Sequence, residues 1–505
     1  MIASIFLPIL LFFQVPAATP APRAAESPKP AESAQKDEPP IVTKHSVRAG
    51  GRQLNYTVTT GFMPLKNAVS GDTEARIFYM AYTLDGATAG ERRPLMFSFN
   101  GGPGSASVWL HLGALGPRRA KMLDDGLMPP PPYELADNEA TWLTETDLVF
   151  VDTVGTGYSR AVKPELASKY YSVNGDIESV GEFIRMYLGR NERWSSPLFL
   201  VGESYGTTRV SGLSNHLFER GIALNGIVLV SSVLNFQTIR FADNNDLPLV
   251  LIFPSYTATA WYHKRLPADL QNRPLRDVLK ESENFASNEF MPALLRIDRL
   301  TAQEKQELLT KFSRYSGLST TFVEQNNFRV ELGEYLKELL RSDRRTAGRL
   351  DSRFTGIDRN AAGDGTDFDP SMTAIRPPYT ATFNDYVRRE LNFRSDLEYY
   401  ILGGGINAPW NWNTNNGYAD TSMPLKSAMA KNPYMKVFVA SGYYDMATPY
   451  FATEYTISAM NLDPTLRRNI SFGYYEAGHM MYIEKNSLRK LKDDVAAFMR
   501  NSLNK

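Results

Sequence analysis

Five short apolar runs constrain the fold of this 505-residue chain more than any other feature. They lie at residues 95–99, 148–151, 198–201, 227–230 and 437–440. Nearly continuous apolar runs of this length are typical of strands buried on both faces, as in a parallel sheet. Helical patterns separate several of the runs, and residues 177–188 repeat apolar side chains at helical spacing. We therefore predict an α/β fold with a central, mostly parallel sheet.

The chain outside these runs divides into further regions. Alternating patterns at residues 53–58 and 76–82 predict two antiparallel strands at the start of the folded part. From residue 237 to residue 420 the pattern becomes helical and charged, and then rich in loops. Because a structureless insertion of this length is unusual, we interpret residues 237–420 as a mainly helical cap. The cap would separate two parts of the sheet domain, residues 41–236 and 421–505.

The first forty residues differ from the rest in composition. Residues 2–15 are almost entirely apolar but too short to span a bilayer, which takes about 20 residues. Small residues follow at 16–18, so we predict a secretory signal at residues 1–18, with a membrane anchor as the alternative. Residues 19–40 are rich in Pro, Ala, Glu and Lys, which predicts a disordered linker. The expected location is periplasmic or secreted, without stable membrane association after signal removal.

Charge and cysteine content exclude several classes of function. Lysine plus arginine number 55 and aspartate plus glutamate also number 55, so the basic surplus of a nucleic-acid-binding protein is missing. The chain has no cysteine, which excludes disulfides, thiol catalysis and thiolate metal sites. Only five histidines are available for imidazole chemistry.

The strongest local motif is Gly-Glu-Ser-Tyr-Gly at residues 202–206. It fits G-x-S-x-G directly after a predicted strand, the setting in which a sharp turn exposes a nucleophilic serine, here Ser204. On this motif alone, a tight glycine turn with an incidental serine stays open. A second glycine-rich segment, residues 100–104, follows the strand at 95–99. α/β-Hydrolases take one oxyanion donor from such a loop and one from the residue after the serine, here Gly102 and Tyr205.

A serine nucleophile needs a base and an acid. His479 follows the apolar stretch at residues 470–472, whereas the other four histidines lie in less suitable places. Asp445 follows the predicted strand at 437–440 and would fix the imidazole tautomer. The order Ser204, Asp445, His479 is that of α/β-hydrolases, and we predict these three as the catalytic triad.

Four sequence blocks in this order resemble the serine carboxypeptidase family, the group that includes carboxypeptidase Y. The blocks are NGGPGSAS with the later LGP, DTVGTGYS, GESYG, and the pair SGYYDMATP and AGHM. The resemblance covers residues 76–233 and 434–483. It implies an α/β-hydrolase fold and an exported serine-type carboxypeptidase that removes C-terminal residues from peptides through an acyl-enzyme, without a cofactor. It also implies that Asn100 and Glu203, helped by the Gly101 backbone, hold the substrate's terminal carboxylate.

Three positions depart from the family pattern. Ser98 stands where the family has a tryptophan, and Ser105 replaces a cysteine. Ala114 replaces the glutamate that would share a proton with Glu203, so burial alone would have to raise the pKa of Glu203. The sequence leaves open an esterase or acyltransferase, which share acyl-serine chemistry, and a non-catalytic binding module. Side-chain preference and oligomeric state are unassigned.

Two weaker signals concern the cap. Acidic and amide residues crowd residues 358–369, but Ala362 stands where a calcium loop needs an oxygen ligand, so we predict a solvated turn and no metal site. Trp261, Trp410 and Trp412 could line a substrate cleft, although packing in the core of the cap is the more common use of tryptophan.

Overall fold

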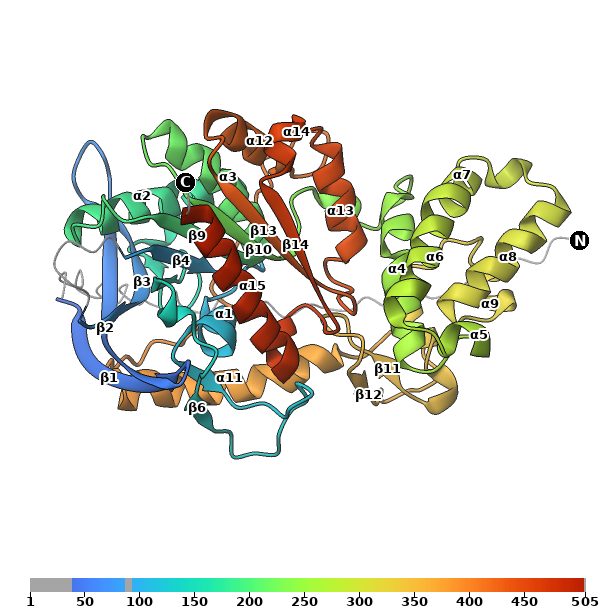
Figure 1. Cartoon of the computed structure of the whole chain (residues 1–505), viewed down its shortest axis with the longest axis horizontal. Helices are drawn as coiled ribbons and strands as arrows, with labels where there is room; N and C mark the ends of the chain where they lie inside the picture. Colours follow the sequence, from blue (N-terminus) through green and yellow to red (C-terminus); the bar gives the residue numbers. More distant parts are fainter. Residues whose placement is uncertain (1–38, 87–92, 504–505) are drawn as a thin grey trace, which may run out of the picture. The chain divides into compact units, whose positions relative to one another are not determined.

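The computed structural model describes residues 39–86 and 93–503. In this part of the chain, one ten-stranded sheet has the order β1-β2-β3-β7-β4-β9-β10-β13-β14, with β8 beside β3 (Figure 1). The strands of this sheet are β1 (Ile41–Ala49), β2 (Arg52–Lys66), β3 (Thr73–Leu84), β4 (Leu95–Phe99), β7 (Asp147–Val151), β8 (Arg160–Ala161), β9 (Leu198–Ser204), β10 (Gly226–Ser232), β13 (Lys436–Gly442) and β14 (Ile470–Tyr475). Two small hairpins pair β5 (Arg118–Ala120) with β6 (Leu135–Asp137) and β11 (Thr346–Ala347) with β12 (Thr355–Gly356).

The predicted strand types are confirmed. β1, β2 and β3 pair antiparallel, and β7 joins β3 antiparallel. From β7 through β4, β9, β10, β13 and β14 every pairing is parallel. β4, β7 and β10 are buried along their whole length, as their continuous apolar sequences require. This sheet, with helices on both faces, is the arrangement of an α/β-hydrolase.

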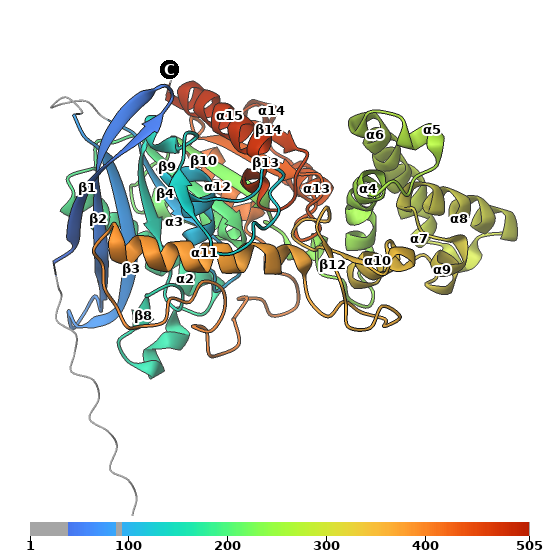
Figure 2. The same cartoon turned by 90° about the horizontal axis from the view of Figure 1, so that it is seen from below.

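Helices cover both faces of the sheet (Figures 1 and 2). The helices are α1 (Val108–Leu110), α2 (Val173–Arg190), α3 (Tyr205–Glu219), α4 (Leu247–Tyr262), α5 (Ala268–Gln271), α6 (Leu275–Phe285), α7 (Met291–Leu294), α8 (Ala302–Ser316), α9 (Thr320–Gln325), α10 (Leu332–Glu338), α11 (Pro370–Arg389), α12 (Ser422–Lys431), α13 (Tyr450–Ala459), α14 (Pro464–Arg467) and α15 (Lys485–Leu503). Side chains of α2, α3 and α12 share one buried cluster with the sheet, and those of α1, α11 and α15 share another. Successive side chains of β4 point to opposite faces of the sheet and so to different clusters. Met96 belongs to the cluster with α1, α11 and α15, while Leu95 and Phe97 belong to the cluster with α2, α3 and α12.

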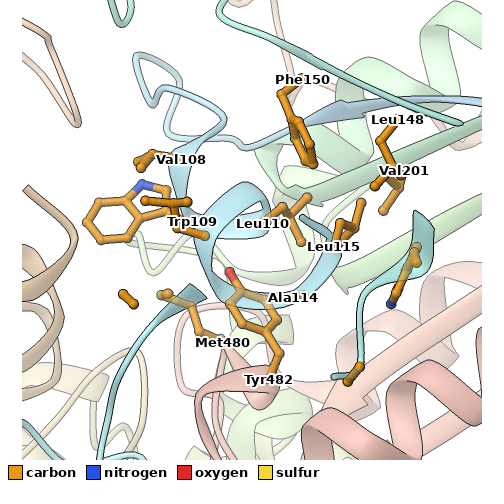
Figure 3. Packing of buried hydrophobic residues seen from close by; sticks show 14 of the residues in the cluster. Val108, Trp109, Leu110, Ala114, Leu115, Leu148, Phe150, Val201, Met480 and Tyr482 are labelled. Atoms are coloured by element: carbon orange, nitrogen blue, oxygen red, sulfur yellow. The ribbon is translucent and has the colours of Figure 1, made fainter. Parts of the chain in front are cut away.

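The second cluster lies directly beneath the site described below. Figure 3 shows Leu148, Phe150 and Val201 of the sheet with Leu110 and Leu115 of the segment that follows the glycine loop. Tyr482 and Met480, which come from the loop after β14, lie in the same region. The packed layer therefore joins the glycine loop to the loop that carries His479.

The segment between β10 and β13 contributes to two cores. Helices α4 to α10 form a separate cluster built around aromatic side chains such as Phe253, Phe290 and Phe312. In contrast, α11 packs its Tyr379 and Phe383 into the cluster on the sheet. The cap boundaries at residues 237 and 420 stay a prediction. The predicted signal, and the linker up to residue 38, lie outside the described residues. Among the residues that are described, no helix is both long and apolar enough to cross a membrane.

Candidate active site

Ser204 lies at the turn between β9 and α3. Its φ of +59° and ψ of −130° are strained for a residue with a side chain. The flanking glycines make the turn possible, since a Cβ on Gly202 would lie 2.2 Å from the carbonyl oxygen of Gly206. The strand and helix thus approach too closely for any other residue, which is the steric requirement behind G-x-S-x-G.

Asp445 and His479 meet at the carboxyl ends of neighbouring strands β13 and β14. Nδ1 of His479 lies 2.8 Å from Oδ2 of Asp445. Oδ1 of Asp445 accepts the backbone N–H groups of Ala447 and Thr448, and Oδ2 accepts the Thr448 hydroxyl at 2.7 Å. Burial by itself would lower the pKa of His479, but the charge and hydrogen bond of Asp445 outweigh it and raise the pKa. With the proton on Nδ1, the His479 Nε2 is left as the basic nitrogen.

The residues between β10 and β13, here termed the inserted region, hold the histidine loop in place through one segment. The carbonyl of Leu350 accepts the N–H of His479 at 2.6 Å, and Oδ2 of Asp351 accepts the N–H of Gly478 at 3.0 Å. Arg353 pairs with Asp351 at 2.6 Å, so the carboxylate is not left unpaired in its buried position. Sequence analysis missed Asp351, because no motif marks a residue that acts across more than a hundred positions.

The glycine loop lies against the serine turn. A Cβ on Gly101 would lie 2.4 Å from the backbone nitrogen of Tyr205, so only glycine allows this approach. Gly102 has a φ of +102°, a conformation that also favours glycine. Tyr205 is the first residue of α3, and its N–H therefore has no acceptor within the helix. Gly102 and Tyr205, the two predicted oxyanion donors, line one cleft together with Ser204 and His479.

Glu203 lies buried beside Ser204, with 4% of its surface exposed. Nδ2 of Asn100 donates to Oε1 of Glu203 at 3.0 Å, and the hydroxyl of Tyr482 donates to Oε2 at 2.5 Å. Burial raises the pKa of Glu203 to about 7, with a further upward push from Asp445, although His479 and the two hydrogen bonds act in the opposite direction. A protonated Glu203 is therefore present in the neutral range.

An aromatic residue, Tyr482, lies in the same cluster as Ala114, which stands where the family has a glutamate. Ala114 is completely buried in the cluster on the sheet, and Tyr482 lies in the same cluster (Figure 3). A Cβ on the neighbouring Gly113 would lie 2.3 Å from the Tyr482 ring, so the ring closely fills this space. Tyr482 is thus the hydrogen-bond partner that Glu203 has instead of a second carboxyl. The sequence carried no motif that would have identified it.

The cleft has a volume of about 540 Å³ and extends from the glycine loop to the inserted region. Seven of the eight predicted site residues line it: Asn100, Gly101, Gly102, Glu203, Ser204, Tyr205 and His479. Asp445 is completely buried behind His479, to which it is hydrogen-bonded. Trp412 also lines the cleft, Trp410 packs against Tyr205, and Trp261 packs against the core of the inserted helices. No group of three or more potential metal ligands occurs in residues 39–86 or 93–503.

The model of the family described as serine carboxypeptidase matches residues 50–480. The chain belongs to this family. Serine carboxypeptidase-like 1 of Arabidopsis thaliana is 27% identical over 206 residues, which cover 39% of this chain and 43% of that protein. Serine carboxypeptidase S10 family member 1 of Dictyostelium discoideum is 26% identical over 164 residues, 32% of this chain and 36% of that protein. This chain therefore matches less than half the length of either curated relative.

A solved structure extends the similarity over most of the chain. The crystal structure of Kex1(delta)p, a prohormone-processing carboxypeptidase from Saccharomyces cerevisiae, aligns with a TM-score of 0.52. The alignment covers 88% of this chain and 91% of that chain, with 15% identical residues. At this identity the similarity shows the fold. The predicted family and α/β-hydrolase fold are confirmed.

Proposed function

We propose that the protein is an exported serine-type carboxypeptidase that removes C-terminal residues from peptides through an acyl-enzyme. The observation that carries this proposal is the buried Glu203, hydrogen-bonded to Asn100 and adjacent to Ser204. A buried carboxyl that keeps its proton near neutrality can donate a hydrogen bond to a substrate carboxylate.

Each catalytic residue has a separate role in this reaction. Ser204 Oγ attacks the scissile carbonyl while His479 Nε2 takes the hydroxyl proton. The N–H groups of Gly102 and Tyr205 stabilise the negative oxygen of the tetrahedral intermediate. His479 then gives its proton to the leaving amine, and the C–N bond breaks to leave an ester on Ser204. Water, deprotonated by His479, attacks this ester and releases the shortened peptide and the free serine.

Export is supported by the sequence of the first forty residues. The apolar run at residues 2–15 and the small residues after it fit a cleaved signal, followed by a linker. Mature protein should begin between residues 18 and 25. Amino-terminal sequencing of protein from the periplasm or medium tests this, and an intact Met1 on protein from the cytoplasm would contradict it.

The activity is tested with a blocked dipeptide, its methyl ester and its amide. A carboxypeptidase hydrolyses the free-acid peptide, and the fluorophosphonate-labelled residue is Ser204. Hydrolysis of the ester without the peptide would favour the esterase or acyltransferase alternative, which shares the acyl-serine step. Absence of hydrolysis together with absence of labelling would favour a binding module.

A further inference from the structure

Two arginines, Arg240 and Arg349, line the same cleft as Ser204 and His479. Both are exposed, and in the part of the chain that the structure describes neither guanidinium forms an ion pair. Other arginines near the site are paired: Arg353 with Asp351, and Arg209 with Asp176. Glu203, the one carboxylate among the described residues that line the cleft, is deeply buried. The open part of the cleft therefore carries two guanidinium groups and no exposed carboxylate among its described lining residues.

Arg349 is held next to two members of the predicted triad by its backbone. Its carbonyl accepts the N–H of Met446 at 3.1 Å, and Met446 follows Asp445 in the chain. The next residue, Leu350, accepts the N–H of His479. Asp369 lies close to the backbone of Arg349, and its Oδ1 accepts the N–H groups of Arg349 and Ser371, but the described residues show no ion pair between this carboxylate and the guanidinium. The guanidinium is thus free to bind a ligand in the cleft.

Arg240 is oriented by aromatic rings. Its guanidinium carbon lies 5.2 Å from the centroid of the Trp412 ring and 5.8 Å from that of Phe236. The Trp412 ring lies 6.1 Å from the ring of Tyr205, the residue after the nucleophile. Stacking on a ring occupies the face of the guanidinium but leaves its N–H edge available for a carboxylate.

The two arginines lie where the acyl part of a substrate would run. With the terminal carboxylate at Asn100 and Glu203 and the scissile carbonyl at Ser204, the rest of the peptide would occupy the remaining part of the cleft, which Arg240 and Arg349 line. An extended chain advances about 3.3 Å per residue, so the penultimate residue and the one before it lie within the same cleft. Their side chains are then the ones that Arg240 and Arg349 can reach.

We propose that Arg240 and Arg349 form a subsite for acidic side chains, so that the enzyme prefers peptides with Glu or Asp at the penultimate position or the position before it. The proposal rests on the proposed carboxypeptidase function. A carboxylate there receives charge-assisted hydrogen bonds in the cleft, whereas a lysine or arginine side chain is repelled. Peptides from acidic tails are the substrate class that this chemistry favours.

The test uses N-blocked tripeptides that differ only by Glu or Gln at one position. For the wild-type protein we expect kcat/KM to be about tenfold higher for Glu than for Gln at one or both acyl-side positions. Arg349→Gln and Arg240→Gln should each lower this ratio, and the double variant should bring it close to one. Arg349→Glu should make a Lys-containing peptide the better substrate. Arg48→Gln, which removes the same charge from an exposed position on β1, should leave the ratio unchanged.

The outcomes separate this proposal from the function on which it rests. Equal hydrolysis of the Glu and Gln peptides by the wild-type protein overturns the subsite and leaves the carboxypeptidase activity standing. A preference for Glu only at the last residue, or a wild-type ratio in the double variant, also overturns it. Failure to hydrolyse either peptide, with no labelling of Ser204, overturns the function itself. The wild-type ratio needs no variant, so poor folding of one variant does not remove the test.

Discussion

The two ends of the cleft are built on opposite physical principles. At one end, Glu203 is buried, and both of its carboxyl oxygens are hydrogen-bonded, to Asn100 and Tyr482. At the other end, Arg240 and Arg349 are exposed and have no ion pair in the described residues. The first end comes from the sheet and its loops, and the second comes from the inserted region and the loop after β10.

This difference determines which solution conditions each end responds to. A buried carboxyl changes its charge near neutrality, so binding at the Glu203 end depends on pH. An arginine keeps its charge at all ordinary pH values, but in an open cleft that charge is screened by salt. Recognition at the two ends can therefore be separated by varying pH and ionic strength independently.

The largest effect is expected from removing the nucleophile, on which hydrolysis of every substrate depends. Ser204→Ala should lower kcat/KM by several orders of magnitude, because members of a catalytic triad act as a unit. His479→Ala should give a comparable loss. The loss should be equal for substrates that differ at either end of the cleft, which steady-state kinetics on the free-acid, amide, Glu and Gln peptides measures.

A matched serine in the same cleft provides the control. Ser105 lines the cleft but accepts a hydrogen bond from Trp109 and is not expected to react. Ser105→Ala should still be labelled by a fluorophosphonate, and Ser204→Ala should not. Labelling of the Ser204→Ala protein would show that another residue is the nucleophile.

The second prediction concerns the charge of the buried end. Because the folded-state pKa of Glu203, about 7, lies above its ordinary value of 4.5, the ionised form destabilises the fold. The contribution of protonated Glu203 to the free energy of unfolding is present in full below about pH 4.5 and is lost as the pH rises through 7. A rise of this size corresponds to about 3 kcal/mol. Glu203→Gln removes the titration, so its stability relative to wild type should increase with pH by up to that amount.

Urea unfolding at about pH 5 and about pH 8 measures the change in this stability difference. Preference for a free C-terminus over an amide should decrease in the wild-type protein across the same range, because an ionised Glu203 repels the substrate carboxylate. In Glu203→Gln this preference should stay constant over the same pH range, because the titrating carboxyl is gone. Parallel stability curves for the two proteins would show that Glu203 is already ionised at low pH.

The third prediction uses the partner of Glu203. The Tyr482 hydroxyl donates to the Glu203 carboxylate and so acts to lower its pKa, against burial. Tyr482→Phe should therefore raise the pKa further and move the loss of free-acid preference to higher pH, by roughly half a unit to one unit. Tyr379→Phe is the control, since Tyr379 is buried close by and makes no hydrogen bond to Glu203. A shift to lower pH in Tyr482→Phe would mean that Tyr482 stabilises the protonated form instead.

The features that could be predicted from the sequence are those that depend on local pattern. The five apolar runs predicted the parallel strands, since burial on both faces demands a continuous apolar sequence. The positions of Ser204, Asp445 and His479 followed from their places after predicted strands, since parallel strands end at one edge of a sheet. These assignments depend on local pattern and chain order, which a sequence contains directly.

Residues that act across large sequence separations could not be found in this way. Tyr482 bonds to Glu203 across 279 positions, and Asp351 bonds to Gly478 across 127. Arg349 lies outside residues 76–233 and 434–483, where the sequence resembles the family. A single exposed arginine in a loop forms no recognisable motif. Each becomes recognisable only when the fold brings it to the cleft.

The smallest effect is expected from removing one hydrogen bond to Asp445, which should change the rate of the reaction but not the recognition of substrate at either end of the cleft. Thr448 donates its hydroxyl to Oδ2 of Asp445, the oxygen that also bonds to His479. Thr448→Val keeps the volume but removes this hydrogen bond, worth about 1 kcal/mol, so kcat/KM should fall by roughly fivefold. The loss should be the same for free-acid and amide peptides and for Glu and Gln peptides, because Asp445 acts on the histidine and not on the substrate. Thr453→Val removes a comparable buried hydrogen bond, to the carbonyl of Ser232, and should leave kcat/KM near the wild-type value. A change in either substrate ratio in Thr448→Val would show that the position of Asp445 also shapes one end of the cleft, and that the two ends are not independent of the triad.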